Sequence, residues 1–149
     1  MHDIRKLITN VLEKGCLMSL ATVDSAGPWV ADVIYIFDED LNIYWMSNPH
    51  VRHSQALLQA FRVAGSITVS GPRENNLGIQ FAGVAKKIDG PRHDLAVKHY
   101  RKRGKPDPTP EQDVLEGDSW YMLKPTSIEL IHEELFDFKK QRYVPEDSL

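Results

Sequence analysis

One short run of the sequence constrains the fold more than any other, because it is apolar on both faces of a strand. Over residues 29–38, one set of alternate positions holds Trp29, Ala31, Val33, Tyr35 and Phe37, and the other holds Val30, Ile34 and Ile36. Side chains alternate across a strand, so a run of this kind is covered on both sides. A barrel interior on one side and a helix or a second subunit on the other would provide the two covers.

Further β-rich runs surround this one and are separated by turn residues. They span residues 17–24, 41–48, 62–70, 77–88, 119–124 and 127–133, and Pro125 is expected to break the last pair. Three helices are expected: one from Asp3 to Gly15, one over residues 49–61 with Asn48 as its cap, and one starting at Pro91. Because several connections are hairpin-short, the pattern favours a mainly β fold. We expect a closed or split barrel of about six strands with two to four flanking helices, forming a single domain over residues 1–149.

Composition limits the class of protein. The 149 residues are 42% apolar, which suits one core, and 18 basic against 21 acidic side chains give a net charge of −3. That balance argues against a dedicated nucleic-acid or membrane-surface protein. The single cysteine, Cys16, excludes an intramolecular disulfide, fits a reducing compartment and is expected to be buried beside Leu17 and Met18. Charged residues among the first 20 argue against a signal peptide, so we expect a cytoplasmic protein.

The most informative stretch for chemistry is residues 44–53, where a strand is expected to end on a hydroxyl residue and a helix to begin. Arg52 and His53 fall in the first turn of that helix, shortly after Ser47. Helix starts present unpaired N–H groups, and the guanidinium fork matches phosphate oxygens, so this stretch could hold a phosphate. An ordinary capped helix with an exposed arginine and histidine explains the same spacing.

The order of several motifs along the chain resembles a known superfamily. Residues 20–24 read LATVD and precede a Gly-Pro turn, Arg52 follows Ser47 by five residues, residues 80–85 read QFAGVA, and residues 120–125 read WYMLKP. This ordered set resembles the pyridoxamine 5'-phosphate oxidase-like FMN-binding split-barrel superfamily over roughly residues 4–133. The strand at residues 78–83 and the tail at residues 136–140 are similar to a small, functionally uncharacterised bacterial branch of it. The resemblance implies a Greek-key-like split barrel that forms a homodimer, with FMN in a groove between the subunits.

The resemblance implies where the phosphate of FMN would be held. Ser47 and Arg52 match the hydroxyl and the arginine of the family, and His53 stands where the better-known members carry a lysine. Two positions depart from the pattern, because Ala31 replaces an arginine of the oxidases and Val51 replaces a hydroxyl residue. The histidine would make part of the charge at this site depend on pH near neutrality.

The resemblance also implies contacts to the flavin ring. The backbone around Asp32, Val33 and Met46 would run along the isoalloxazine, and Gln80 lies on the strand that commonly offers a polar side chain to it. Trp120 lies on a strand near the dimer groove of the family. The tail through residues 141–144 lacks the Arg and His set with which the true oxidases grip their substrate. We therefore expect no turnover of pyridoxamine or pyridoxine phosphate.

Other sites and functions remain to be weighed. The basic run at residues 98–105 could bind nucleic acid, but we favour a solvated helix end because the rest of the chain is slightly acidic. His50 and His53 lie three residues apart, yet no partner motif accompanies them, so no metal site is expected. Two function classes survive: an FMN-dependent oxidoreductase acting on a small molecule, and a non-catalytic flavin, haem or F420 binding module on the same fold.

Overall fold

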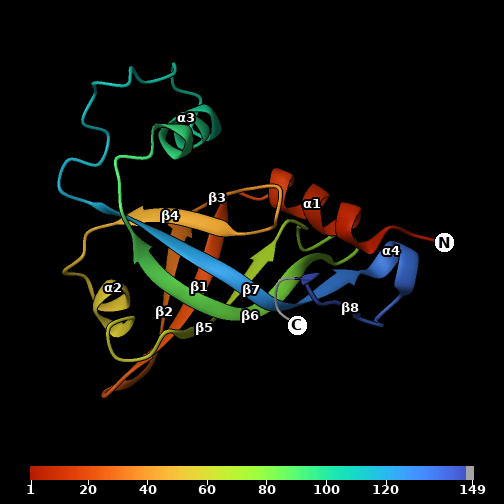
Figure 1. Cartoon of the computed structure of the whole chain (residues 1–149). Helices are drawn as coiled ribbons and strands as arrows, with labels where there is room; N and C mark the ends of the chain where they lie inside the picture. Colours follow the sequence, from red (N-terminus) through yellow and green to blue (C-terminus); the bar gives the residue numbers. More distant parts are fainter. Residues whose placement is uncertain (147–149) are drawn as a thin grey trace.

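The computed structural model describes residues 1–146 and shows a mainly β protein with four helices (Figure 1). In chain order the elements are α1 (Ile4–Lys14), β1 (Leu17–Asp24), β2 (Gly27–Ile34), β3 (Ile36–Phe37), β4 (Ile43–Ser47), α2 (Arg52–Ala56), β5 (Arg62–Thr68), β6 (Leu77–Ile88), α3 (His93–Lys102), β7 (Ser119–His132), α4 (Glu133–Phe136) and β8 (Gln141–Tyr143). None of the helices among the described residues has the length and apolar character needed to cross a membrane.

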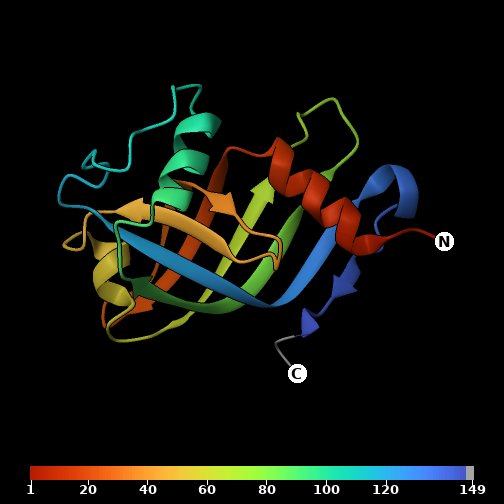
Figure 2. The same cartoon turned by 45° about the horizontal axis from the view of Figure 1, so that its top comes forward.

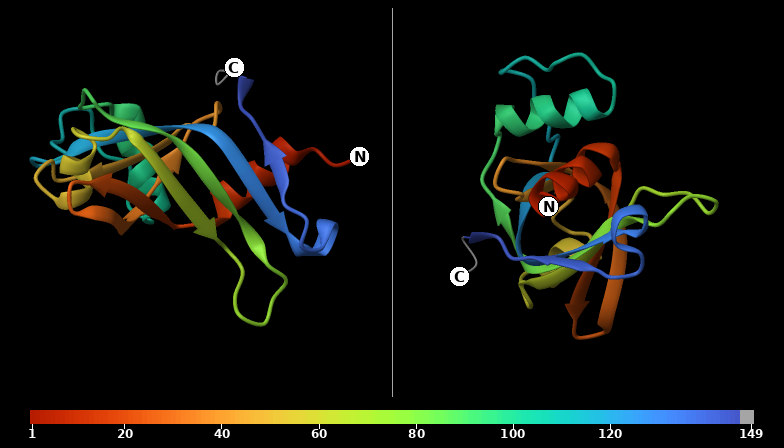
Figure 3. Two further views of the ribbon diagram at one scale, coloured as in Figure 1. Left: turned by 90° about the horizontal axis from the view of Figure 1, so that it is seen from below. Right: turned by 90° about the vertical axis from the view of Figure 1, so that its right-hand side faces the viewer.

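The strands form one antiparallel sheet that curls into a split barrel (Figures 1 and 3). Neighbouring strands follow the order β2-β1-β5-β6-β7-β4-β3, and β8 pairs with β7 beside this path. The chain passes from β2 on one edge to β3 on the other through Tyr35 alone. The predicted mainly β split barrel is confirmed, and the strand order, with β5 beside β1 and β4 beside β7, explains why the sheet curls rather than forming a simple meander.

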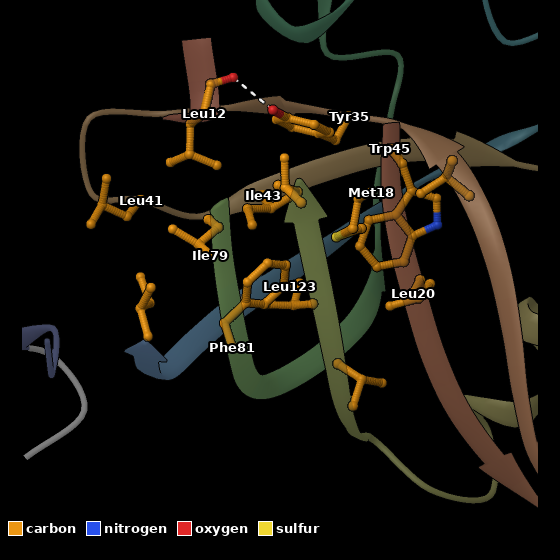
Figure 4. Packing of buried hydrophobic residues seen from close by; sticks show 14 of the residues in the cluster. Leu12, Met18, Leu20, Tyr35, Leu41, Ile43, Trp45, Ile79, Phe81 and Leu123 are labelled. Atoms are coloured by element: carbon orange, nitrogen blue, oxygen red, sulfur yellow. Dashed lines mark hydrogen bonds between the residues drawn. The ribbon is translucent and has the colours of Figure 1, made fainter. Parts of the chain in front are cut away.

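The barrel interior holds the larger of two apolar clusters (Figure 4). Met18 and Leu20 of β1, Trp45 of β4 and Leu123 of β7 point into it, and each is fully buried. One end is closed by α1, which inserts three apolar side chains: Ile8, Val11 and Leu12. Asp3 caps this helix as predicted, because its carboxylate accepts the Lys6 amide at 3.1 Å.

The second cluster lies on the opposite face of β4 and β7, beneath α3 (Figure 2). Tyr44 and Trp120 face outward from the two strands and meet Leu95 and Ala96 of the helix. The neighbouring Trp45 faces the barrel interior, so β4 is buried on both faces. A strand between two apolar layers loses the polar alternation that normally marks a strand.

The two-faced run that opened the sequence argument is only partly covered within the chain. Tyr35 is buried in the barrel and Ile36 is buried beneath α3, which matches the expected two covers. Trp29 and Val30 of β2 are 44% and 61% exposed. Val30 lies on the outer face of β2 and Trp29 on the same face as Val33, so within residues 1–146 the outer face of β2 is left uncovered at Val30.

Two sequence expectations about local structure are wrong. Pro125 does not end a strand, because β7 runs without interruption from Ser119 to His132. Pro125 pairs with Gly83 at a register shift in the ladder, and a bulge accommodates a residue that lacks an N–H donor. Cys16 is exposed rather than buried, since it lies in the connection between α1 and β1.

Candidate functional site

The corner between the end of β4 and the start of α2 holds the side chains that the sequence singled out. The helix itself is shorter than predicted, spanning Arg52–Ala56 instead of residues 49–61. Asn48 does not cap it, because its side-chain oxygen accepts the His50 amide at 2.8 Å and forms a local turn instead. The amides of Ser54 and Gln55 both donate to the Val51 carbonyl.

Ser47 and His53 meet across this corner. Ser47 Oγ lies 3.0 Å from His53 Nε2, and both residues are half-buried. Burial lowers the pKa of His53 below its ordinary value, so the imidazole is neutral at pH 7. When Nε2 carries the proton, His53 donates to Ser47 and leaves the hydroxyl proton free for another acceptor.

Arg52 lies in the same corner but is already paired. Its Nε and Nη2 donate to the two carboxylate oxygens of Asp24 at 2.9 and 3.2 Å, and the guanidinium lies 4.2 Å from the centroid of the Trp29 ring. The side chains of Arg52 and Asp24 are 35% and 13% exposed. The hydrogen bond from Arg52 also lowers the pKa of Asp24, so the carboxylate stays charged at neutral pH.

Asp24 and Trp29 are the members of this corner that the sequence did not identify. Both belong to the β1–β2 hairpin, and Asp24 lies 28 positions before Arg52 in the chain. Asp24 ends a strand and also accepts the Ala26 amide at 2.9 Å, which is the usual role of an aspartate in a turn. No sequence signal connects this turn residue with the start of α2, which follows β4.

Asp32 and Gln80 lie elsewhere, on the outer face of the sheet. Asp32 accepts a hydrogen bond from Ser19 at 2.7 Å, and Gln80 accepts one from Lys140 at 2.9 Å. Between them a shallow hollow of about 550 Å³ crosses β1, β5, β6 and β7. Its lining consists mainly of small side chains, among them Ser19, Ala21, Ala64, Ser66, Ala82 and Ser127.

The remaining predicted contacts point into the two apolar clusters. Val33 is 8% exposed and faces the barrel interior, while Met46 packs against the cluster beneath α3. Trp120 is completely buried, and its indole N–H donates to the Pro91 carbonyl at 2.9 Å. With its ring between β7 and α3, Trp120 is a core residue in this chain.

No three His, Cys, Asp or Glu side chains within residues 1–146 gather closely enough to hold a metal ion. His53 is hydrogen-bonded to Ser47, and the backbone amide of His50 is held by the Asn48 side chain. The arrangement at the corner can bind an anion and orient it by hydrogen bonds. Among the described side chains of the corner, one guanidinium faces one carboxylate, and the imidazole adds no charge at pH 7.

Solved structures with a similar fold belong to split-barrel proteins. A putative pyridoxamine 5'-phosphate oxidase of Listeria innocua matches with a TM-score of 0.69 at 15% identity, over 87% of this chain and 98% of that one. A heme binding protein of Mycobacterium smegmatis matches with a TM-score of 0.71 at 14% identity, over 99% and 60% of the two chains. An F420 reductase matches with a TM-score of 0.63 at 18% identity, over 80% and 93%. At these identities the likeness shows the fold alone.

Sequence relatives are more specific. No family model matches the chain. A UPF0306 protein of Yersinia enterocolitica is 28% identical over 140 residues, which cover 92% of this chain and 90% of that protein. A UPF0306 protein of Serratia proteamaculans is 30% identical over 101 residues, covering 64% and 68%. On this similarity, the chain belongs to the UPF0306 family.

Proposed function

We propose that this protein is an FMN-binding flavoprotein and that it acts as an oxidoreductase on a small molecule. One observation carries the proposal: at one corner of a split barrel Ser47 contacts His53, and Arg52 begins the same short helix. A guanidinium, a hydroxyl and an imidazole form a donor set that suits a phosphate group. Solved proteins of similar fold include a putative pyridoxamine 5'-phosphate oxidase and an F420 reductase.

The residues of the corner would share the work of holding the phosphate. Arg52 would supply charge and a fixed pair of donors, while Ser47 would donate its hydroxyl proton with His53 holding the oxygen in place. The exposed part of the Trp29 ring offers a flat apolar surface beside them. Bound FMN would supply the hydride and electron chemistry, and the chain would bind and orient it.

Asp24 limits how well this corner can hold a phosphate. It occupies the Nε and Nη2 edge of Arg52, which is one of the edges that bind oxyanions in a bidentate way. A phosphate must share the guanidinium with Asp24 or displace it. We expect Asp24 to weaken the binding of phosphate ligands, and this expectation gives the proposal a sharp test.

We further propose that the protein is a homodimer whose second copy completes the site. Asp32 and Gln80 lie on the outer sheet face and not in the corner, so one chain does not bring all the predicted contacts together. That face exposes Val30 and is lined by small side chains, which allow close approach of another surface. Light scattering is expected to give the mass of a dimer at micromolar concentration. A monomer that still binds flavin would exclude the shared site.

The experiment is a titration of FMN and riboflavin into three proteins: the wild type, Arg52→Ala and Asp24→Asn. Because a charge-assisted hydrogen bond contributes about 1.5–3 kcal/mol, Arg52→Ala is expected to weaken FMN about ten- to a hundredfold. Asp24→Asn should tighten FMN about fivefold, since it frees the guanidinium from a partly exposed pair. Riboflavin lacks the phosphate and should respond to neither change.

A matched control is available in the second bidentate pair of the protein. Asp94 pairs with Arg92 at 3.0 and 2.9 Å in the same geometry, at the start of α3. Asp94→Asn should leave the affinity for FMN unchanged. If Arg52→Ala weakens FMN and riboflavin equally, Arg52 supports the fold and not a phosphate. If neither flavin binds the wild type or Asp24→Asn, the cofactor proposal is wrong.

One observation favours a second candidate, a non-catalytic or catalytic F420 site. The guanidinium and the carboxylate of the corner balance each other, and His53 is neutral at pH 7. Such a corner suits the single charge of a phosphodiester better than the nearly double charge of a phosphate monoester. F420 carries a phosphodiester beside its ring system. Tighter binding of F420 than of FMN by the wild type, with the order reversed in Asp24→Asn, would favour this candidate, whereas a haem spectrum in the purified protein would exclude both.

A further inference from the structure

A hollow lies away from the corner, between α1 and α3. It measures about 830 Å³, and we call it the α1–α3 groove. The first helix covers one end of the barrel and α3 lies on the outer face of β4 and β7, with the β3–β4 hairpin between them (Figure 2). The apolar side chains along the groove come from Leu12, Ile36, Phe37 and Leu41. Sites for small molecules are commonly of this size and are lined by apolar side chains with a few polar groups.

Three cations hold fixed positions along the groove. Lys102 Nζ donates to the Tyr35 carbonyl at 2.5 Å, and Lys98 Nζ donates to the Phe37 carbonyl at 2.9 Å. Arg5 of α1 donates to the Glu39 carbonyl. The three acceptors are alternate carbonyls along the chain: Phe37 belongs to β3, an edge strand of the sheet, and Tyr35 and Glu39 lie just before and after it. Each ammonium has three donors and uses one of them in these bonds, so both lysines retain donors for a ligand.

The charges lining the groove balance as a whole, but its two lysines have no ion pair. The Asp38 carboxylate accepts from Asp40, Asn42 and Tyr44 in its own turn, and these neutral donors leave its negative charge in place. Arg101 pairs with Asp107 at 2.8 Å. Arg5, Lys98 and Lys102 then stand against Glu13, Asp38 and Glu39, and no ion pair to Lys98 or Lys102 is found within residues 1–146.

Lys102 is the cation with the strongest need for an anionic partner. It is half-buried, its Nζ lies 3.3 Å from the centroid of the Tyr35 ring, and no ion pair to it is found within residues 1–146. Burial lowers the pKa of Lys102 to about 8, which reflects the cost of a charge with little water around it. A carboxylate placed beside Nζ would offset that cost.

We propose that the α1–α3 groove binds a small monocarboxylic acid with an apolar body, the carboxylate lying between Lys98 and Lys102 and the body lying against Phe37. Neither lysine has an ion pair within residues 1–146, and the two lie one helical turn apart on the same face of α3. None of these residues belongs to the Ser47–Arg52–His53 corner. The inference therefore does not depend on the cofactor proposed above.

A purely structural role explains part of the same geometry and makes a different prediction. Cations beside an unpaired strand edge protect it from pairing with another chain. If the three cations serve only this purpose, the groove binds no acid, and removing a lysine changes stability or aggregation alone.

Isothermal titration of the full chain with octanoate separates the two explanations. We expect saturable binding of octanoate, with acetate and octan-1-ol each at least tenfold weaker because one lacks the apolar body and the other the charge. Lys102→Met and Lys98→Met should each weaken octanoate about tenfold or more. Lys87→Met is the matched control, since Lys87 is exposed on β6 outside the groove, and it should leave the affinity unchanged.

A second variant keeps the test valid if a lysine variant is unstable. Thr9→Phe adds bulk from α1 into the groove without removing a cation, and it should abolish octanoate binding while the thermal unfolding midpoint stays close to that of the wild type. Absence of saturable octanoate binding to the wild type at millimolar concentration would overturn the proposal. Equal weakening in Lys102→Met and Lys87→Met would overturn it as well.

Discussion

The barrel interior and the layer beneath α3 bury their helices by different means. Into the barrel, α1 inserts three apolar side chains that are at most 1% exposed. The buried side chains of α3 are Leu95, Ala96 and His99, and His99 is 3% exposed with no hydrogen-bond partner for Nδ1 among the described residues. A helix held by two apolar side chains and a buried imidazole is expected to open before the barrel does.

The two layers differ in stability although β4 and β7 contribute side chains to both. Leu123 of β7 faces the barrel and Trp120 faces α3, so one strand ties the two regions together. The barrel is further held by continuous hydrogen-bond ladders, such as the pairing of β6 with β7 over most of their length. The outer layer has side-chain contacts and the lysine bonds to β3 in place of such ladders. Stability is thus concentrated in the barrel.

The largest expected effect is the loss of Trp45 from the barrel. Trp45 is fully buried and stacks on Tyr121 with ring centroids 5.8 Å apart. Trp45→Ala should lower the free energy of unfolding by about 3–5 kcal/mol, because it leaves a large cavity in a close-packed interior. Urea unfolding followed by circular dichroism measures this loss. Trp29→Ala removes a tryptophan that is 44% exposed and should cost less than half as much, whereas equal losses would contradict the comparison.

Acid should act on the α3 layer through His99. Burial, together with the nearby Arg103, Lys102 and Lys105, lowers the pKa of His99 to about 4. Above about pH 6.5 the imidazole is neutral in the folded and the unfolded chain alike, so His99 does not lower the free energy of unfolding. As the pH falls from 6.5 to 4, the imidazole takes up a proton in the unfolded chain before it does so in the folded chain, and this favours unfolding. The expected loss is about 3 kcal/mol over this window. Hydrogen exchange of the α3 amides against pH measures it.

A variant assigns this acid sensitivity to one residue. His99→Phe keeps an aromatic ring against Trp120, whose centroid lies 5.9 Å from that of His99, and removes the titrating group. The exchange of α3 should then change little between pH 6.5 and 4. His50→Phe, at an exposed position, should keep the wild-type profile. Identical pH profiles for His99→Phe and the wild type would show that another group controls α3.

A smaller loss is expected at Gly83, where β6 and β7 approach closely. A Cβ at this position would lie 2.4 Å from the Lys124 carbonyl oxygen, and a backbone atom in a bulge has little room to move. Gly83→Ala should destabilise the barrel by roughly 1–3 kcal/mol. Gly71→Ala meets only the end of the Glu74 side chain at 3.0 Å and should be nearly neutral by the same urea assay. If Gly83→Ala leaves the free energy of unfolding unchanged, the β6–β7 ladder can shift to accommodate a Cβ, and the barrel is less rigid than we infer.

The smallest expected effect is a gain in stability when Thr22 is replaced. Like His99 in the α3 layer, Thr22 is a buried polar residue with an atom that has no partner among the described residues. Thr22 is 1% exposed, and its hydroxyl has no hydrogen-bond partner among the residues that the structure describes. Thr22→Val keeps the shape and removes the buried polar group, so it should stabilise the fold by about 1 kcal/mol. Thr68→Val at an exposed position should stay within about 0.5 kcal/mol of the wild type. A destabilised Thr22→Val would indicate that the hydroxyl has a partner such as a buried water.

The sequence by itself determined the local elements and the mainly β class. Asp3 caps α1, Gly27 adopts a positive φ of 110° in the turn between β1 and β2, and alternating apolar residues mark β1. These features depend on neighbours in the chain, on backbone sterics and on the period of the side chains. The ordered motifs also brought Ser47, Arg52 and His53 to attention before their positions in space were known.

Only the tertiary structure decided what those residues meet. The ion pair between Arg52 and Asp24, the burial of Trp120 beneath α3, and the lysines of α3 on the carbonyls of β3 all join segments that are distant in the chain. Local spacing holds no information about such contacts, because they depend on how the sheet curls and where the helices settle on it. For the same reason Pro125 continues a strand that its chemistry alone would end, since Gly83 on the neighbouring strand makes room for the bulge.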